Sequence, residues 1–420
     1  MLNSETAWIN AAITAARPQV LGALLRYFRV LDAAEDAFQE ACLRALKTWP
    51  VKGPPRDPAA WLIFVGRNFA LDEVRRRSRQ TELPAEEELV IDHEDPQEEL
   101  AERLDASHYR DDILRLLFVC CHPDLPVSQQ IAVALRIVSG LTVKEIARAF
   151  LVSESAMEQR ITRAKARITA ADVPFDTPGA PERAQRLAAV STMIYLIFNE
   201  GYAASGGNAH VRVSLCEEAI RLGRLLLGLF PDESEIMGLL ALLLLQHARA
   251  SARLDAENNI VLLEDQDRDL WDHELIVEGL TLVGKAIRQR RVGPYQVQAA
   301  IAAVHAQAAR ATETDWAEID RLYEILETLQ PSPVVTLNRA VAVAKLRGPA
   351  EALSMIEPLA PKLTGYFYFF GLKGALLTQL GQTDAARANF NKAISLANTA
   401  AEAAHIRSHL DRLQKDSESA

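Results

Sequence analysis

Cysteine is scarce in this chain, and the cysteines that it has show no metal-binding spacing. Cys42, Cys120, Cys121 and Cys216 are the only four among 420 residues, and they form no C-x-x-C pair. Disulfide frameworks and structural zinc sites need several closely spaced cysteines. The sequence therefore predicts no disulfide and no metal site, and a reducing, cytoplasmic environment is expected.

Long apolar runs and aromatic residues are scarce as well. The most apolar stretch, residues 239–245, is far shorter than the roughly 20 residues of a membrane-spanning helix. The N-terminus shows no charged-then-apolar signal pattern, so no membrane partner is expected. Aromatic residues make up 6% of the chain against 49% for all hydrophobic residues, and this aliphatic composition favours helices. A chain of this length exceeds one hydrophobic core, which predicts two to four domains.

Positive charge is in the minority, since the net charge is −10 at pH 7 and the pI is near 5.5. This excludes a wholly basic coat for nucleic acid, but a basic module can lie beside an acidic one. Residues 82–105 are rich in carboxylates and contain Pro84, Pro96 and only one Lys or Arg, Arg103, which predicts a linker. The basic clusters on either side are Arg75, Arg76, Arg77 and Arg79, and Arg160, Arg163, Lys165 and Arg167.

Proline and glycine divide the chain into helical segments. The stretch PVKGPPRDP at residues 50–58 predicts a loop in the first segment, and residues 172–181 mark the end of the third. We expect an all-α protein in which two small helical domains, joined by the acidic linker, precede a helical-repeat domain. The expected boundaries are residues 1–80, 81–108, 109–171 and 182–420.

The C-terminal part contains a partial internal repeat. Gly348 and Gly381 lie 33 residues apart. The same offset relates Ala342 to Ala375, Ala352 to Ala385 and Ala360 to Ala393. Small residues at this spacing let paired helices approach closely, and the period is similar to that of the tetratricopeptide unit, about 34 residues. Two units are too few for a stable solenoid, so residues 182–330 are expected to supply further helical pairs.

The stretch LTVKEIARAFLVSESAMEQRITRAKARI, residues 141–168, predicts two helices joined by a short turn. Thr142 and Glu145 match a T-x-x-E capping box at the first helix, and Ser155 and Glu158 match S-x-x-E at the second. The second helix is expected to bury Met157, Ile161, Ala164 and Ile168, and to turn Ser155, Gln159, Thr162, Arg163 and Ala166 outward. A polar, basic face suits the major groove of DNA. The alternative is an ordinary helical hairpin with a solvated face.

Two helices of the first segment carry further outward faces. In LDAAEDAFQEACLRALKTW, residues 31–49, an apolar stripe is expected to face inward, while carboxylates and one leucine lie outward and indicate either a protein-docking face or a solvated one. In AAWLIFVGRNFALDEVRRRSR, residues 59–79, Trp61, Asn68, Asp72 and arginines share one stripe. Such a stripe suits unstacked bases and phosphates, although Trp61 could equally belong to the core.

Taken together, EDAFQEACLRAL, AWLIFVGRNFALDEVRRRSR and LTVKEIARAF followed by SESAMEQRITRAKARI resemble the extracytoplasmic-function (ECF) sigma factors of bacterial RNA polymerase. This resemblance covers residues 10–170. The later segments FNEGYAAS (198–205), LLEDQDR (262–268), GPYQVQAAIAAVHA (293–306) and SPVVTLNRAVAVA (332–344) resemble the tetratricopeptide-like C-terminal extension of one sigma subgroup. Its members are typically encoded near small DGPF or YCII-like proteins, which makes such a protein a candidate partner.

The resemblance implies a promoter-specificity subunit that binds core RNA polymerase and promoter DNA. The clamp helices of the largest polymerase subunit would be bound by Asp36, Gln39, Glu40, Leu43 and Arg44. The −10 element would be bound by Trp61, Asn68, Arg75, Arg76, Arg77 and Arg79, with the loop at residues 51–57 nearby. The −35 element would be bound by Ser155, Glu158, Gln159, Arg160, Thr162, Arg163 and Arg167. Glu158 departs from the basic residue often found at its position. The acidic linker would thread through polymerase, or serve only as a solubilising tether.

Other functions stay open on the residues alone. The chain could be a stand-alone helix-turn-helix regulator with a protein-binding repeat domain, or a repeat scaffold with an incidental helix-turn-helix. Carboxylates at residues 199–202 and 262–268 could suggest a catalytic or metal pocket. No nucleophile–base pair or phosphate-binding loop accompanies them. We therefore expect no enzyme activity, no catalytic residue and no cofactor, and a C-terminal domain that controls sigma activity.

Overall fold

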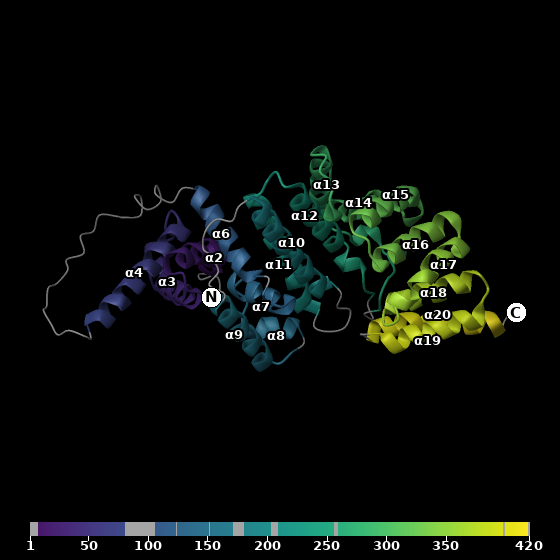
Figure 1. Cartoon of the computed structure of the whole chain (residues 1–420), viewed down its shortest axis with the longest axis horizontal. Helices are drawn as coiled ribbons and strands as arrows, with labels where there is room; N and C mark the ends of the chain where they lie inside the picture. Colours follow the sequence, from purple (N-terminus) through teal and green to yellow (C-terminus); the bar gives the residue numbers. More distant parts are fainter. Residues whose placement is uncertain are drawn as a thin grey trace. The chain divides into compact units, whose positions relative to one another are not determined.

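The computed structural model of the chain is helical throughout the part that it describes (Figure 1). These residues are 7–79, 106–122, 124–150, 152–170, 180–202, 209–255, 259–397 and 400–418. Within them no strand occurs, and one isolated antiparallel bridge joins Leu254 to Ile260. The chain divides into two compact units, Met1–Leu196 (the N-terminal unit) and Ile197–Ala420 (the C-terminal unit). The all-α prediction is confirmed. Of the linker predicted at residues 81–108, residues 81–105 lie outside the described residues, and residues 106–108 are helical.

The N-terminal unit begins with three long helices that pack on one another: α2 (Ala7–Phe28), α3 (Leu31–Lys52) and α4 (Pro58–Arg79). Their core contains Leu24, Phe38 and Leu62. It is closed at one end by Trp49, whose ring stacks on Trp8 at 6.1 Å and meets Trp61 edge-on at 5.4 Å. An aromatic cluster of this kind stabilises the bundle through burial and ring geometry together.

The loop predicted for residues 50–58 is shorter in the structure than in the sequence pattern. The chain stays helical through Pro50 and ends α3 only at Lys52. Proline lacks an N–H, so at this position it removes one hydrogen bond from the last turn without ending the helix. Gly53 then leaves the helix with a φ of 83°, a conformation that glycine adopts without strain.

Four further helices of the N-terminal unit are α6 (Ala106–Cys120), α7 (Val127–Ile137), α8 (Val143–Ala149) and α9 (Glu154–Ala170). Helix α6 packs on α2 at Gly22, where an added Cβ would lie 2.6 Å from the Asp112 carbonyl oxygen. Asp112 is fully buried, and its carboxylate lies 3.4 Å from Arg26 Nε and 3.7 Å from Arg115 Nη1. The close approach and the buried charge hold α6 against α2.

Helix α10 (Ala180–Tyr202) belongs to both units, because the division falls between residues 196 and 197. Its first part packs in the N-terminal unit, where Met193 Sδ lies 3.4 Å from Cys121 Sγ and the Arg186 guanidinium lies over the Phe118 ring at 5.4 Å. Residues 182–196, which the sequence assigned to the extension, therefore contribute to the core of the N-terminal unit.

The C-terminal unit is a succession of helices, each packed mainly on helices one or two places away in the chain (Figure 1). They are α11 (Ala209–Leu229), α12 (Ser234–His247), η1 (Ala250–Ala252), η2 (Arg268–Leu270), α13 (His273–Arg288), α14 (Pro294–Gln307), η3 (Ala311–Glu313), α15 (Trp316–Leu329), α16 (Pro333–Arg347), α17 (Pro349–Ile356), η4 (Glu357–Lys362), α18 (Phe367–Gln379), α19 (Thr383–Leu396) and α20 (Ala400–Glu418). Neighbour-to-neighbour packing is typical of helical repeats. The expectation of further helical pairs before residue 330 is confirmed.

The apolar run at residues 239–245 lies in α12, and every side chain of the run is buried. Helices α11, α13 and α14 all pack against α12, which explains why no polar face is present. Among the residues that the structure describes, no helix is long and apolar enough to cross a membrane. The run is a core helix, as the sequence predicts.

The two glycines of the predicted repeat occupy equivalent positions in the structure, but one of its alanine pairs is offset by one residue. Gly348 and Gly381 both have a positive φ, 93° and 72°, and each lies between the two helices of a pair. Ala352 is buried in α17, but its predicted equivalent Ala385 is exposed and the neighbouring Ala386 is buried instead. Helix α19 starts one residue later after its glycine than α17 does, so the pairing of Ala352 with Ala385 is wrong by one residue.

Two of the sequence segments in the extension have structural roles. In GPYQ, the Glu235 carboxylate accepts hydrogen bonds from Tyr295 N and Gln296 N, both at 3.1 Å, and so caps α14. A Cβ on Gly293 would lie 2.2 Å from Glu235 Cδ, so any larger residue here would displace the carboxylate that caps α14. In SPVVTLNRAVAVA, the Arg339 side chain binds three carboxylates of α15, Asp320 at 2.7 Å, Glu327 at 2.8 Å, and Glu324.

Candidate nucleic-acid interface

The first helix of the candidate DNA-reading pair begins as its sequence predicts. Thr142 is the N-cap of α8, and its hydroxyl accepts a hydrogen bond from Glu145 N at 3.2 Å. The Glu145 carboxylate accepts one in return from Thr142 N at 2.7 Å, which completes the capping box. The start of α8 is therefore fixed by four consecutive residues.

The start of the second helix was predicted two residues too late. Helix α9 begins at Glu154, and the Ser153 hydroxyl accepts a hydrogen bond from Ala156 N at 3.2 Å. Ser153 is therefore the cap, and Ser155, which the S-x-x-E pattern favoured, lies inside the first turn. The pattern misled because two serines stand two residues apart, and the one that matches S-x-x-E, Ser155, already lies inside the helix that Ser153 caps.

Helix α9 has the two faces expected of a recognition helix. Met157, Ile161, Ala164 and Ile168 are buried, as predicted. Among the candidate −35 residues, Arg160 is half-buried, and the exposed ones are Ser155, Glu158, Gln159, Thr162, Arg163 and Arg167. An exposed row of amide, hydroxyl and guanidinium groups can reach base edges and phosphates.

The basic side chains of α9 have different partners. Arg163 Nη2 lies 3.5 Å from Gln159 Oε1, and Arg167 Nη1 donates to Gln129 Oε1 of α7 at 3.2 Å. Lys165 instead pairs with α3, at 2.9 Å from Asp32 Oδ1 and in close contact with Glu35 Oε2. Among the described residues, Arg163 thus has no carboxylate contact that would hold it back from a phosphate, whereas Lys165 is paired with two carboxylates.

The Lys165 pair links α9 to a helix 130 residues away, which sequence reasoning did not find. Burial alone would lower the pKa of Lys165, but the hydrogen bonds to Glu35 and Asp32 outweigh burial, and its pKa is raised. A second link runs from Arg17 of α2, whose Nε donates to the Ile137 carbonyl at 2.8 Å. The helix-turn-helix is therefore held against α2 and α3 within the N-terminal unit.

The outward face of α3 carries the candidate polymerase-binding residues. Asp36, Gln39 and Arg44 are exposed, and Leu43 is 53% exposed. Glu40 is half-buried and accepts a hydrogen bond from Arg44 Nε at 3.1 Å. The face also includes Leu46, 41% exposed and one turn after Leu43, which sequence reasoning missed. An i, i+3 leucine pair was the signal that could have found it.

The inward stripe predicted for α3 is present. Leu31, Ala34, Phe38, Ala45 and Trp49 are buried, as expected. Cys42 is only half-buried, and burial raises the pKa of its thiol to about 11. The thiol is therefore protonated near neutral pH and serves packing.

The candidate −10 face on α4 is described only in its first half. Trp61 is half-buried against Trp49, so the core interpretation of this residue holds for at least part of its ring. Asn68 is half-buried on the same helix, and its neighbour Arg67 lies over the Tyr27 ring at 4.9 Å. The remaining −10 candidates belong to the helical backbone of α4, but the structure does not describe their side chains. They are Arg75, Arg76, Arg77 and Arg79.

Known protein families match these same regions. The Sigma-70 region 2 model matches residues 12–80, which contain α3 and α4. The Sigma-70 region 4 model matches residues 115–168, which contain the α8–α9 pair. A family of unknown function (DUF6596) matches residues 186–287, at the start of the extension. The two sigma regions therefore coincide with the helices that carry the exposed polar faces.

One curated relative spans nearly the whole chain. The uncharacterized protein R00370 of Rhizobium meliloti (strain 1021) is 66% identical over 410 residues, which cover 98% of this chain and 97% of that protein. The crystal structure of yeast Tom70 aligns with 96% of this chain and 83% of its own, at a TM-score of 0.37 and 14% identity, which is too low to bear on function. The full-length match to R00370 and the matches to Sigma-70 regions 2 and 4, in that order, show that the chain belongs to an ECF-like sigma factor family, whose members bind core RNA polymerase and promoter DNA to initiate transcription.

Proposed function

We propose that this chain is a promoter-specificity subunit of bacterial RNA polymerase in which the extension supports or regulates the two DNA-reading regions. One observation carries the proposal. Helices α3 and α9, in the matched region 2 and region 4, both bury an apolar stripe and expose a polar face at the positions that the resemblance assigns to polymerase and to DNA.

Polymerase binding is assigned to the α3 face. Asp36, Gln39, Glu40, Leu43 and Arg44 would contact the clamp helices of the largest subunit, and Leu46 extends the apolar part of the face. Two exposed leucines surrounded by charged groups suit a protein interface, because apolar contacts then form at its centre and polar ones at its rim. The carboxylates would set the orientation and speed of association.

Promoter recognition is divided between two helices. On α9, Ser155, Glu158, Gln159 and Thr162 would lie at bases of the −35 element, and Arg160, Arg163 and Arg167 at phosphates. Glu158 could accept a hydrogen bond from a cytosine amino group. On α4, the −10 element would be held by Trp61, Asn68, Arg75, Arg76, Arg77 and Arg79, with unstacked bases near the first two.

The extension is proposed to act on the same reaction. Helix α9 ends at Ala170 and α10, which leads into the extension, begins at Ala180, so only a short connection that contains Pro174 and Pro178 separates the −35-binding helix from α10. Its partner could be a small DGPF or YCII-like protein, as in the subgroup that the extension resembles. We favour a supporting role, in which the extension holds the DNA-reading domains in a productive arrangement, over a masking role.

Transcription with purified core polymerase tests the proposal. Promoter output that depends on this chain supports a sigma factor, whereas operator binding without any effect on core polymerase would support a stand-alone regulator. The extension is tested with a fragment ending at residue 196, because a cut at residue 181 would remove Met193 and Arg186 from the N-terminal core. We expect the fragment to stay helical by circular dichroism and to give lower output. Higher output would indicate masking, and equal output would exclude both forms of coupling.

A further inference from the structure

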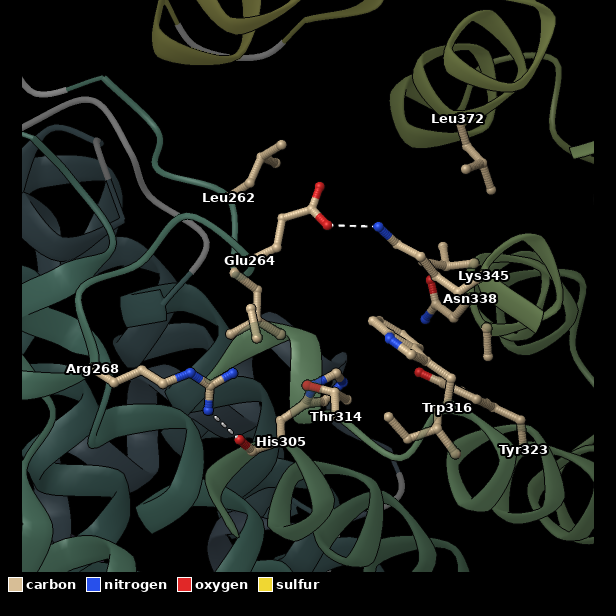
Figure 2. Close-up of a pocket in the computed structure, with 15 residues that line it drawn as sticks. Leu262, Glu264, Arg268, His305, Thr314, Trp316, Tyr323, Asn338, Lys345 and Leu372 are labelled. Atoms are coloured by element: carbon tan, nitrogen blue, oxygen red, sulfur yellow. Dashed lines mark hydrogen bonds and ion pairs between the residues drawn. The ribbon is translucent and has the colours of Figure 1, made fainter. Parts of the chain in front are cut away.

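The C-terminal unit contains a cavity of 390 Å³ between the segment at residues 262–268 and helices α15 and α16 (Figure 2). Its size is at the lower end of the range found for small-molecule sites, about 300 to 1,000 Å³. Thr314 and Leu372 complete the wall from the η3 turn and from α18. The cavity lies wholly within the C-terminal unit.

Three of the sequence segments singled out in the extension meet at this cavity. LLEDQDR contributes Glu264 and Arg268, GPYQVQAAIAAVHA contributes His305, and SPVVTLNRAVAVA contributes Asn338 and Val341. From the sequence alone, the side chains of LLEDQDR have no assigned function. In the structure these side chains line the same cavity, which their spacing along the chain could not show.

The walls are largely apolar and include two aromatic rings. Trp316 and Tyr323 come from α15, and Figure 2 shows both on the side of the cavity opposite Arg268. The His305 ring meets Trp316 edge-on at 5.4 Å, and the Lys345 ammonium lies 5.9 Å from the Trp316 ring centre. Ring walls of this kind bind a flat apolar body through area and stacking.

The polar groups give the cavity a net positive charge. Arg268 Nη1 donates to the His305 carbonyl at 2.6 Å and to the Ala308 carbonyl at 2.7 Å, and its guanidinium lies over Trp271 at 4.5 Å. These contacts fix the guanidinium in place, and Figure 2 shows it turned toward the cavity. Across from it, Lys345 Nζ pairs with Glu264 Oε2 at 2.6 Å.

The charge count favours a single negative charge on the ligand. Burial, together with Arg249 and Arg268, lowers the pKa of His305 to about 4, so its imidazole is neutral near pH 7. Arg249 and Glu313 are the further charged groups that act on Arg268. Among the residues that line the cavity, Arg268 and Lys345 are positive and Glu264 is negative, which leaves an excess of one positive charge.

We propose that this cavity binds a small organic monoanion, with an aromatic body against Trp316 and Tyr323 and a carboxylate directed to Arg268 and Lys345. The proposal goes beyond promoter recognition and needs neither polymerase nor DNA for its test. A charge-assisted hydrogen bond is about twice as strong as a neutral one, so the anionic group should contribute most of the selectivity.

The test is calorimetric titration of the full-length protein with 2-naphthoate and with its uncharged counterpart, 2-naphthamide. We expect one saturable site for the carboxylate and binding of the amide weaker by about tenfold. Equal affinity for the two compounds, or no saturable binding of 2-naphthoate up to its solubility limit, would overturn the proposal. Failure here leaves transcription by the chain untouched, so the two proposals are distinguishable.

Three variants locate the site. Lys345→Met should weaken 2-naphthoate about tenfold and leave 2-naphthamide unchanged. Glu264→Gln should strengthen 2-naphthoate, because Lys345 then loses its internal partner. Lys392→Met removes the same charge from the exposed face of α19 and should change nothing. If Lys392→Met weakens binding as much as Lys345→Met does, the carboxylate binds through general surface charge and the assigned cavity is wrong. Circular dichroism and thermal melting verify that each variant is folded.

Discussion

Arg163 and Lys165 lie two residues apart on the same helix, yet the structure assigns them opposite tasks. Arg163 is exposed and contacts only a neutral amide, Gln159, among the contacts that the structure shows. Lys165 is engaged by Asp32 and by the buried Glu35. We predict that Arg163→Ala reduces DNA binding without loss of stability and that Lys165→Ala does the reverse.

The expected sizes follow from these surroundings. Each phosphate contact contributes about 0.9 to the slope of log K against log salt, so Arg163→Ala should flatten the slope by about that amount. Lys165→Ala leaves a buried carboxylate without its hydrogen-bonding cation, which costs about 1 to 3 kcal/mol. Arg17 still acts on Glu35 electrostatically, so we expect the lower half of that range.

The assay is holoenzyme binding to a promoter duplex at several salt concentrations, followed by thermal unfolding of the free proteins. Asp32→Asn is the matched control for the pair, because the Asp32 side chain is 65% exposed and should contribute less than about 1 kcal/mol. Equal slope changes from Arg163→Ala and Lys165→Ala would refute the reasoning. They would mean that Lys165 leaves α3 and contacts DNA in the holoenzyme.

Three further outcomes are expected. Asp36→Arg combined with Glu40→Arg should abolish binding to core polymerase, measured by co-purification, with the helical content kept; the control Asp384→Arg at the start of α19 should bind normally, and retained binding by the double variant would remove the docking assignment. Gln159→Ala should change the preference among −35 bases by about 1 to 3 kcal/mol in a sequence-variant binding series, and a uniform loss across all sequences would contradict a base contact. Burial holds the pKa of His305 at about 4, below its usual 6.5, so its contribution to stability is present above pH 6.5 and is lost as the pH falls toward 4; melting curves of His305→Gln should lack this part of the pH dependence, and an unchanged pH profile would exclude it.

Local features of the fold could be predicted from the sequence, because their causes lie within a few residues. The Thr142–Glu145 capping box and the buried face of α9 are of this kind. Ser153 was missed because it lacks a glutamate three residues later, whereas Ser155, two residues further on, has one in Glu158. In the repeat, the one-residue shift at Ala385 depends on the length of a turn, which composition does not encode.

Long-range features could not be predicted in the same way. The Lys165–Glu35 pair joins residues 130 apart, and no pattern on either helix distinguishes that lysine from its basic neighbours. The cavity needs side chains from segments near residues 264, 305 and 338, which come together only when α14, α15 and α16 pack. Sequence reasoning found each segment, but their meeting point is a property of the packing.

The all-round apolar surface of α12 has a consequence for synthesis of the chain. Helix α12 leaves the ribosome before α13 and α14, which pack against it. Part of its leucine surface therefore stays exposed to solvent until residue 307 has been made. During that interval the nascent chain presents a site that chaperones recognise and that other chains can associate with. We expect fragments ending between residues 248 and 272 to be insoluble when expressed, while a fragment ending at residue 196 stays soluble. Proteolysis within α13 or α14 should likewise convert the intact protein into an aggregating one.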